Sequence, residues 1–163
     1  MKTKSKWLVF ILLFSFILAS INVQAADDRL GTIVDGSLLT EDTVVEGFSR
    51  QSELIERGTY LSNGNGRLSN NGNRSVNVYG STSGNRTCDQ IKVTLYLQRL
   101  VGNSWVTVYT LGPKTATNSY FVSNSKNYTV TGGYYYRVKG SHTAIKGTTT
   151  ESTSSYTDGL WIK

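Results

Sequence analysis

The side chains that could catalyse a reaction are few in this chain. The only thiol belongs to Cys88 and the only imidazole to His142. A Cys88–His142 pair with Asp158 behind it would supply the nucleophile, base and orienting acid that acyl transfer needs. No local sequence around these residues supports that arrangement. We therefore interpret His142 as a structural histidine and Cys88 as a buried small hydrophobic residue.

Carboxylates and metal ligands are equally sparse. Glycoside cleavage needs two acids, and beyond residue 57 the chain offers Asp89, Glu151 and Asp158, which we interpret as surface charges. No group of residues has the spacing of metal ligands. The glycines between residues 58 and 84 precede no helix signal, as a phosphate loop would require. We expect a protein that is not an enzyme and that uses no cofactor.

Aromatic side chains on one predicted hairpin suggest binding instead. Tyr96, Trp105 and Tyr109 fall on one face of it, with Lys92 nearby. Aromatic planes beside hydrogen-bonding side chains suit sugars, and beside basic side chains they also suit single-stranded nucleic acid. These four residues are the predicted ligand surface, and nucleic acid is not the expected partner. The alternative is that part of this face is core, with Trp105 closing one end of the fold.

The hairpin that carries these aromatic residues covers residues 90–111. Apolar residues alternate with polar ones from Ile91 to Leu97, which is the period of a strand buried on one face. Gly102 and Asn103 suit a two-residue turn. Counting outward from that turn pairs residues 101 with 104, 100 with 105, 99 with 106, 97 with 108 and 96 with 109. This register places Tyr109 on the face of Tyr96 and Trp105.

Short strands with Gly, Asn and Ser between them recur from residue 58 to the C-terminus, which is typical of an all-β sandwich or barrel. Tyr136 follows a Gly-Gly turn and lies two residues before Val138. This is the place of the tyrosine corner in immunoglobulin-like and fibronectin type III-like sandwiches, in which the hydroxyl group bonds back to the backbone. We predict an antiparallel sandwich of that type over residues 58–163.

The first 25 residues have the three parts of a secretory signal peptide. Three lysines precede an apolar run from Trp7 to Ile21, and small residues stand at Val23 and Ala25. Cleavage would fall between Ala25 and Ala26. The run is shorter than a membrane span, so we expect a secreted protein without a stable membrane anchor.

Charge divides the remaining chain into two parts. Without the three lysines of the signal peptide, the formal charge falls from +6 to +3. Residues 26–56 carry eight acids and two arginines, whereas residues 57–163 carry twelve basic residues and three acids. The first part has no sustained period, and we interpret residues 26–57 as a flexible, largely irregular acidic leader. The alternative is that one of its apolar stretches adds a strand to a sheet edge.

Several segments together resemble an uncharacterised family of small exported proteins from Gram-positive bacteria. They are DGSLLTEDTVVEGFS, VNVYGSTSG, IKVTLYLQRLVGNSWVTV and GGYYYRVKGSHTA. The resemblance implies export and an immunoglobulin-like fold, and it carries no activity or site residue. We expect a secreted binding module whose basic body favours an anionic wall polymer, a glycan or a protein. The alternative is a secreted, toxin-like antagonist that the acidic leader shields.

Overall fold

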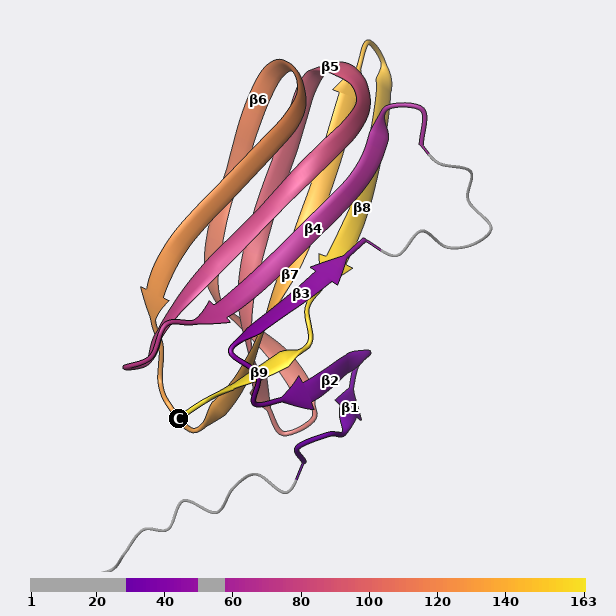
Figure 1. Cartoon of the computed structure of the whole chain (residues 1–163). Coiled ribbons are helices and arrows are strands. Elements are labelled where there is room, and N and C mark those ends of the chain that lie inside the picture. The colour runs from indigo at the N-terminus through magenta and orange to yellow at the C-terminus, as the bar shows by residue number, and fades with distance from the viewer. Residues whose placement is uncertain (1–28, 50–57) are drawn as a thin grey trace, which may run out of the picture.

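The computed structural model describes residues 29–49 and 58–163, which form nine strands and no helix (Figure 1). The strands are β1 (Ile33–Val34), β2 (Ser37–Thr40), β3 (Val44–Phe48), β4 (Leu61–Asn70), β5 (Ser75–Val101), β6 (Ser104–Thr129), β7 (Tyr134–Lys146), β8 (Thr149–Tyr156) and β9 (Gly159–Ile162). The prediction of an all-β fold is confirmed. The predicted signal peptide and its cleavage site, Ala25–Ala26, lie outside the described residues.

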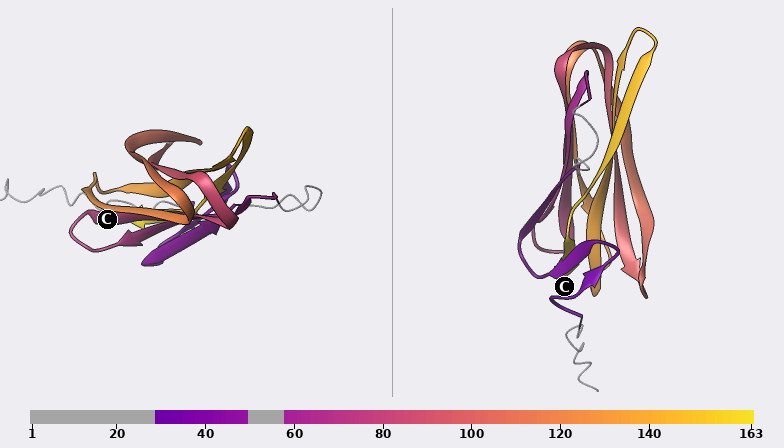
Figure 2. Two further views of the ribbon diagram at one scale, coloured as in Figure 1. Left: turned by 90° about the horizontal axis from the view of Figure 1, so that it is seen from above. Right: turned by 90° about the vertical axis from the view of Figure 1, so that its right-hand side faces the viewer.

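All nine strands belong to one hydrogen-bonded sheet that folds back on itself (Figure 2). The bend in the sheet lies in β5 and β6, which form one long hairpin. Residues 84–87 of β5 lie opposite Tyr120 alone, and this large bulge lets the hairpin bend over. Before the bend β5 pairs with β4, and after it β5 pairs with β7. The sheet therefore has a first half, with β3 and β4, and a second half, with β7, β8, β9 and β2.

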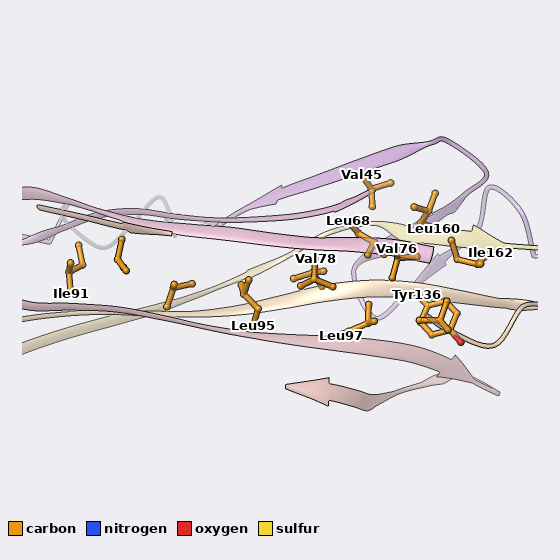
Figure 3. Close-up of a cluster of buried hydrophobic side chains, with 14 residues drawn as sticks. Val45, Leu68, Val76, Val78, Ile91, Leu95, Leu97, Tyr136, Leu160 and Ile162 are labelled. Carbon is orange, nitrogen blue, oxygen red and sulfur yellow. The ribbon is translucent and has the colours of Figure 1, made fainter. Parts of the chain in front are cut away.

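The hydrophobic core fills the space between the two halves (Figure 3). Alternate residues of each strand point inward, as the period-2 pattern of the sequence requires. Leu68, Val76 and Val78 come from the first half, and they face residues such as Leu95 and Val138 from the second half. Because β5 contributes to both halves, one strand supplies apolar side chains to both sides of the core.

The predicted turn of the hairpin is confirmed and its register is confirmed in part. Val101 pairs with Ser104, Leu100 with Trp105 and Arg99 with Val106. The predicted pairs further from the turn are wrong, because Leu97 pairs with Tyr109 and Tyr96 pairs with Thr110. A bulge at Val108 adds one residue to β6 and moves residues 109–111 to the opposite face, until a second irregularity at Gly112-Pro113 restores the earlier parity, as in the pair Ile91↔Ala116.

The interpretation of residues 26–57 as a largely irregular leader is wrong for residues 29–49. β3 pairs antiparallel with β4 from Val44↔Ser69 to Phe48↔Asn65. β2 pairs parallel with β9, and β1 pairs with β2. Val45 is buried in the core. The alternative considered above therefore holds for this stretch, which adds strands at both ends of the sheet, whereas residues 26–28 and 50–57 lie outside the described residues.

The hydroxyl group of Tyr136 donates a hydrogen bond of 2.7 Å to the backbone carbonyl of Thr131. The predicted return bond from this tyrosine to the preceding backbone is confirmed. Burial is the main cause that raises the pKa of Tyr136, and the nearby Arg99 guanidinium opposes it. Tyr136 thus fixes the turn that leads into β7, the strand that also carries Arg137 and Lys139.

Candidate functional site

Cys88 and His142 do not form a pair. The Sγ atom of Cys88 donates to the carbonyl of Arg86 at 3.3 Å, and the side chain is buried against Leu61 and Ala144. Burial raises the pKa of this thiol. Cys88 is therefore the buried small side chain that the sequence predicts, and a thiol in this state is a poor nucleophile.

His142 is fully buried in the core between the two halves. Its Nδ1 atom lies 2.8 Å from the Thr82 hydroxyl oxygen, and its Nε2 atom lies 2.8 Å from that of Ser155. The Thr82 hydroxyl donates its hydrogen bond to the carbonyl of Lys92. Its oxygen therefore accepts a hydrogen bond from Nδ1–H of His142, and Nε2 of His142 accepts one from the Ser155 hydroxyl. Burial lowers the pKa of His142 to about 4. The ring is a neutral bridge between the halves.

The Ser155–His142 hydrogen bond resembles that of a serine nucleophile and its base, but it serves structure. Ser155 is itself fully buried, and both ring nitrogens are already partnered. The ring also fills space that small residues leave open, since a Cβ atom built on Gly64 would lie 2.1 Å from the ring. No substrate atom could reach this serine without moving the sheet.

Each of the three acids beyond residue 57 makes its own structural contacts, and they do not form a pair. Glu151 accepts three backbone N–H groups from residues 59–61, at 2.6 to 3.0 Å. Asp89 pairs with Lys146 at 2.7 Å, and this hydrogen bond is the main cause that lowers the pKa of Asp89. Asp158 accepts from the backbone of Leu38. Within residues 29–49 and 58–163, no group of three His, Cys, Asp or Glu side chains could hold a metal ion.

The predicted ligand surface does not form as a set of four. Tyr109 pairs with the core residue Leu97, so it lies on the opposite face of the sheet from Tyr96, where it is 41% exposed and its ring stacks on Tyr128 at 4.5 Å between centroids. Tyr96, Trp105 and Lys92 lie on the outer face of the second half, and each is half-buried. The prediction that placed Tyr109 beside them is wrong because of the bulge at Val108.

Trp105 contributes to a cavity that the sequence did not reveal. The cavity has a volume of about 860 Å³ and lies on the outer face of the second half. Its lining comes from five strands, β3, β5, β6, β7 and β8, and from the turns before β2 and before β6. The lining residues are Asp35, Gly36, Phe48, Gln98, Asn103, Ser104, Trp105, Arg137, Lys139, Ser154 and Tyr156. A volume of this size accommodates a small-molecule ligand or part of a polymer.

Arg137 forms the floor of this cavity, and its side chain is 3% exposed. The guanidinium group donates from Nε to Gln98 at 2.9 Å, from Nη1 to the Ser37 hydroxyl at 2.9 Å and from Nη2 to the Asp35 carboxylate at 2.9 Å. It lies between two rings, 4.6 Å from the centroid of Trp105 and 4.9 Å from that of Tyr156. Burial lowers the pKa of Arg137 and the bond to Asp35 opposes that effect. Three side-chain hydrogen bonds and two aromatic rings thus fix the position of the guanidinium group.

Trp105 has a second role as the closing residue of the fold. Its indole N–H donates to the carbonyl of Val34 at 3.1 Å. Its ring packs against a small cluster that contains Leu39, Leu100 and Tyr135. The alternative role predicted for Trp105, a plug at one end of the fold, is therefore confirmed, and the same ring forms one wall of the cavity.

The outer face beyond the cavity carries rows of hydroxyl side chains, each interrupted by one lysine. Thr115, Lys92, Thr143 and Ser152 form one row across four strands, because β5 pairs with β6 and β7, and β7 pairs with β8. Thr110, Tyr96, Lys139 and Tyr156 form the row beside the cavity. The cavity thus opens onto a polar face rather than onto an apolar one.

Comparison with protein-family models matches residues 35–159 to a family of unknown function (DUF6147). The chain belongs to this family. Membership confirms the expected uncharacterised family and names no ligand. The matched residues include β2 and β3, so they agree with the structure in joining these strands to those after residue 58. No curated protein and no solved structure matches the chain.

Sequence reasoning missed Arg137, Lys139, Tyr156 and Asp35 as members of one site. Arg137 and Lys139 alternate with core residues along β7, which is the signal that both point outward. The partner of Arg137, however, lies 102 positions away in the stretch interpreted as leader.

In the part of the chain that the structure describes, no helix is long and apolar enough to cross a membrane.

Proposed function

We propose that this member of the family is a secreted, non-enzymatic binding module, and that the Arg137 cavity is its ligand-binding site. Export rests on the signal-peptide pattern of residues 1–25. Origin in a Gram-positive bacterium rests on the resemblance of the sequence segments. The binding role rests on the cavity, which gathers residues from five strands and two turns around one buried guanidinium group.

The proposed ligand class is a glycan. The single observation that carries this proposal is that two aromatic rings, of Trp105 and Tyr156, border one cavity together with amide and hydroxyl side chains. Sugar rings present apolar C–H faces and polar hydroxyl groups, so they need both kinds of partner at once. Asn103 and Ser154 supply donors and acceptors at the cavity, whereas the amide of Gln98 is bonded to Arg137 and Thr107. The hydroxyl-rich outer face extends these partners beyond it.

We also propose that the folded sheet is related to the immunoglobulin-like and fibronectin type III-like sandwiches. The Tyr136–Thr131 hydrogen bond and the packing of two sheet halves over one core support this relation. The continuous strands β5 and β6, which run through both halves, are a departure from two separate sheets.

The toxin-like alternative is less well supported by the fold. It needs an acidic leader that can be removed without harm to the basic body. In residues 29–49, β2 and β3 instead pair with β9 and β4, and Asp35 is bound to Arg137. Removal of this stretch would take strands from the sheet and expose a buried charge.

Calorimetric titration of the secreted chain with a panel of soluble oligosaccharides, neutral and acidic, tests the proposal. Tyr156 is half exposed, so Tyr156→Ala should leave the fold intact and weaken binding at least about tenfold, which corresponds to about 1.4 kcal/mol. The matched control is Tyr120→Ala, since Tyr120 is also exposed but does not line the cavity. Absence of binding across the panel, or equal loss in both variants, would contradict the proposed function.

A further inference from the structure

The charges around the cavity are unequal. Arg137 and Lys139 supply two positive charges, and among the described lining residues Asp35 is the acid. Asp35 is already bound to Arg137, with its carboxylate at the rim and 71% exposed. One positive charge is therefore left over at the cavity.

Lys139 carries that remaining charge. Its Nζ atom lies 5.6 Å from the centroid of the Tyr156 ring. Of the carboxylates that the structure describes, none lies within ion-pairing distance of Lys139. The ring of Tyr156 therefore has Arg137 and Lys139 near it at once, 4.9 Å and 5.6 Å from its centroid. A ring gives a cation only weak compensation, so Lys139 can still bind an anion.

Arg137 has one donor left as well. A guanidinium group has five N–H bonds. Nε donates to Gln98, Nη1 donates to Ser37 and to the carbonyl of Asp35, and Nη2 donates once to the Asp35 carboxylate. For the second N–H of Nη2, the described residues provide no acceptor. A buried arginine that lines a cavity and keeps one donor without an acceptor is suited to a ligand oxygen.

We propose that the ligand carries an anionic group, carboxylate or phosphate, which binds between the second N–H of Arg137 Nη2 and the Nζ atom of Lys139. This inference rests on the proposed function and names the chemical class of the glycan as acidic. The aromatic and polar lining of the cavity contacts the sugar, and the two cations bind its charge. Arg137 is fixed by its other hydrogen bonds before the ligand arrives, so little ordering accompanies binding.

The test compares three probes on the full secreted chain: a neutral oligosaccharide, an uronic acid oligosaccharide of similar length and a polyol-phosphate polymer. Calorimetry gives the affinity of each. Lys139→Gln should weaken an acidic probe about tenfold, as expected for the loss of a charge-assisted hydrogen bond. The same variant should change the affinity of the neutral probe less than about twofold. The two acidic probes distinguish a carboxylate ligand from a phosphate ligand.

Lys92→Gln is the matched control. Lys92 lies on the same outer face, four residues along β5 from Tyr96, which is about 13 Å at the rise of a strand. The Lys92→Gln variant removes the same net charge as Lys139→Gln and leaves the cavity lining unchanged. Equal weakening by Lys92→Gln and Lys139→Gln would mean general attraction by the basic face and would overturn the proposal. A neutral probe that binds as well as the acidic probes, and that weakens only with Tyr156→Ala, would also overturn it while leaving the proposed function intact.

Discussion

Acidification should destabilise this protein through His142. The native ring is buried and neutral, and its pKa is lowered to about 4, whereas an exposed histidine in the unfolded chain has the ordinary pKa of about 6.5. Between these values the unfolded state binds a proton that the native state does not. The stabilising contribution is complete above pH 6.5 and is lost as the pH falls toward 4. At pH ~4.5 the free energy of unfolding should have fallen by about 2.5 kcal/mol from this group alone.

The groups that face the ring are neutral, so no charge offsets this effect. Thr82 and Ser155 contact the two nitrogens, and Gly64 and Gly140 lie against the ring. Urea unfolding, followed by tryptophan fluorescence at pH ~7.5 and ~4.5, measures the change. His142→Gln supplies the control, because its side chain is polar but does not titrate. The variant should be less stable at neutral pH and should lose about 2.5 kcal/mol less than the wild type on acidification.

Two results would refute this reasoning. The first is an equal loss of stability in the wild type and in His142→Gln, which would assign the pH dependence to carboxylates. The second is available even if the variant fails to fold. An NMR titration of the single histidine should show no midpoint near pH 6.5 in the native chain, and a normal midpoint there would contradict the buried neutral ring.

Three further changes test other contacts. Gly64→Ala should destabilise the fold by about 1 to 3 kcal/mol, because its Cβ atom would lie 2.1 Å from the ring of His142. Gly66→Ala should destabilise it less, since the closest atom to a Cβ there is 3.3 Å away. Thermal unfolding of the two variants makes the comparison. Tyr136→Phe should lower the free energy of unfolding by about 1 kcal/mol through loss of one hydrogen bond, and an unchanged midpoint in urea would contradict that value. Arg137→Met should increase hydrogen exchange in residues 33–40, because it removes the bonds that hold this stretch, and unchanged protection would show that they are not needed.

The sequence predicts the hairpin well because local pattern determines it. Alternation from Ile91 to Leu97 and the Gly102-Asn103 turn were sufficient for the first three pairs. The bulge at Val108 was missed because alternation continues on both sides of it. The signal for the bulge is the pair Val108-Tyr109, two adjacent apolar residues. Even-numbered residues of β6 lie on the core side of the sheet up to Val108, and odd-numbered residues do so from Tyr109 to Leu111.

Other parts of the fold depend on partners that are distant in sequence. The Asn-Gly repeat at residues 63–66 has the composition of a turn, but it lies within β4. Gly64 stands there because the ring of His142 needs the room. Residues 33–48 likewise show no clear period, since their strands are short and each pairs with a distant strand. Arg137 could not be recognised as part of a site for the same reason, because its acid and both of its rings come from other strands.

The hairpin of β5 and β6 has a mechanical consequence. Each of these strands crosses the bend and belongs to both halves of the sheet, so no linker exists about which the halves could swing apart. Neither half could be excised and kept as an autonomous folding unit, because the cut would sever both long strands. In the proposed binding role, the cavity would keep one shape, and selectivity would come from that shape rather than from closure around the ligand.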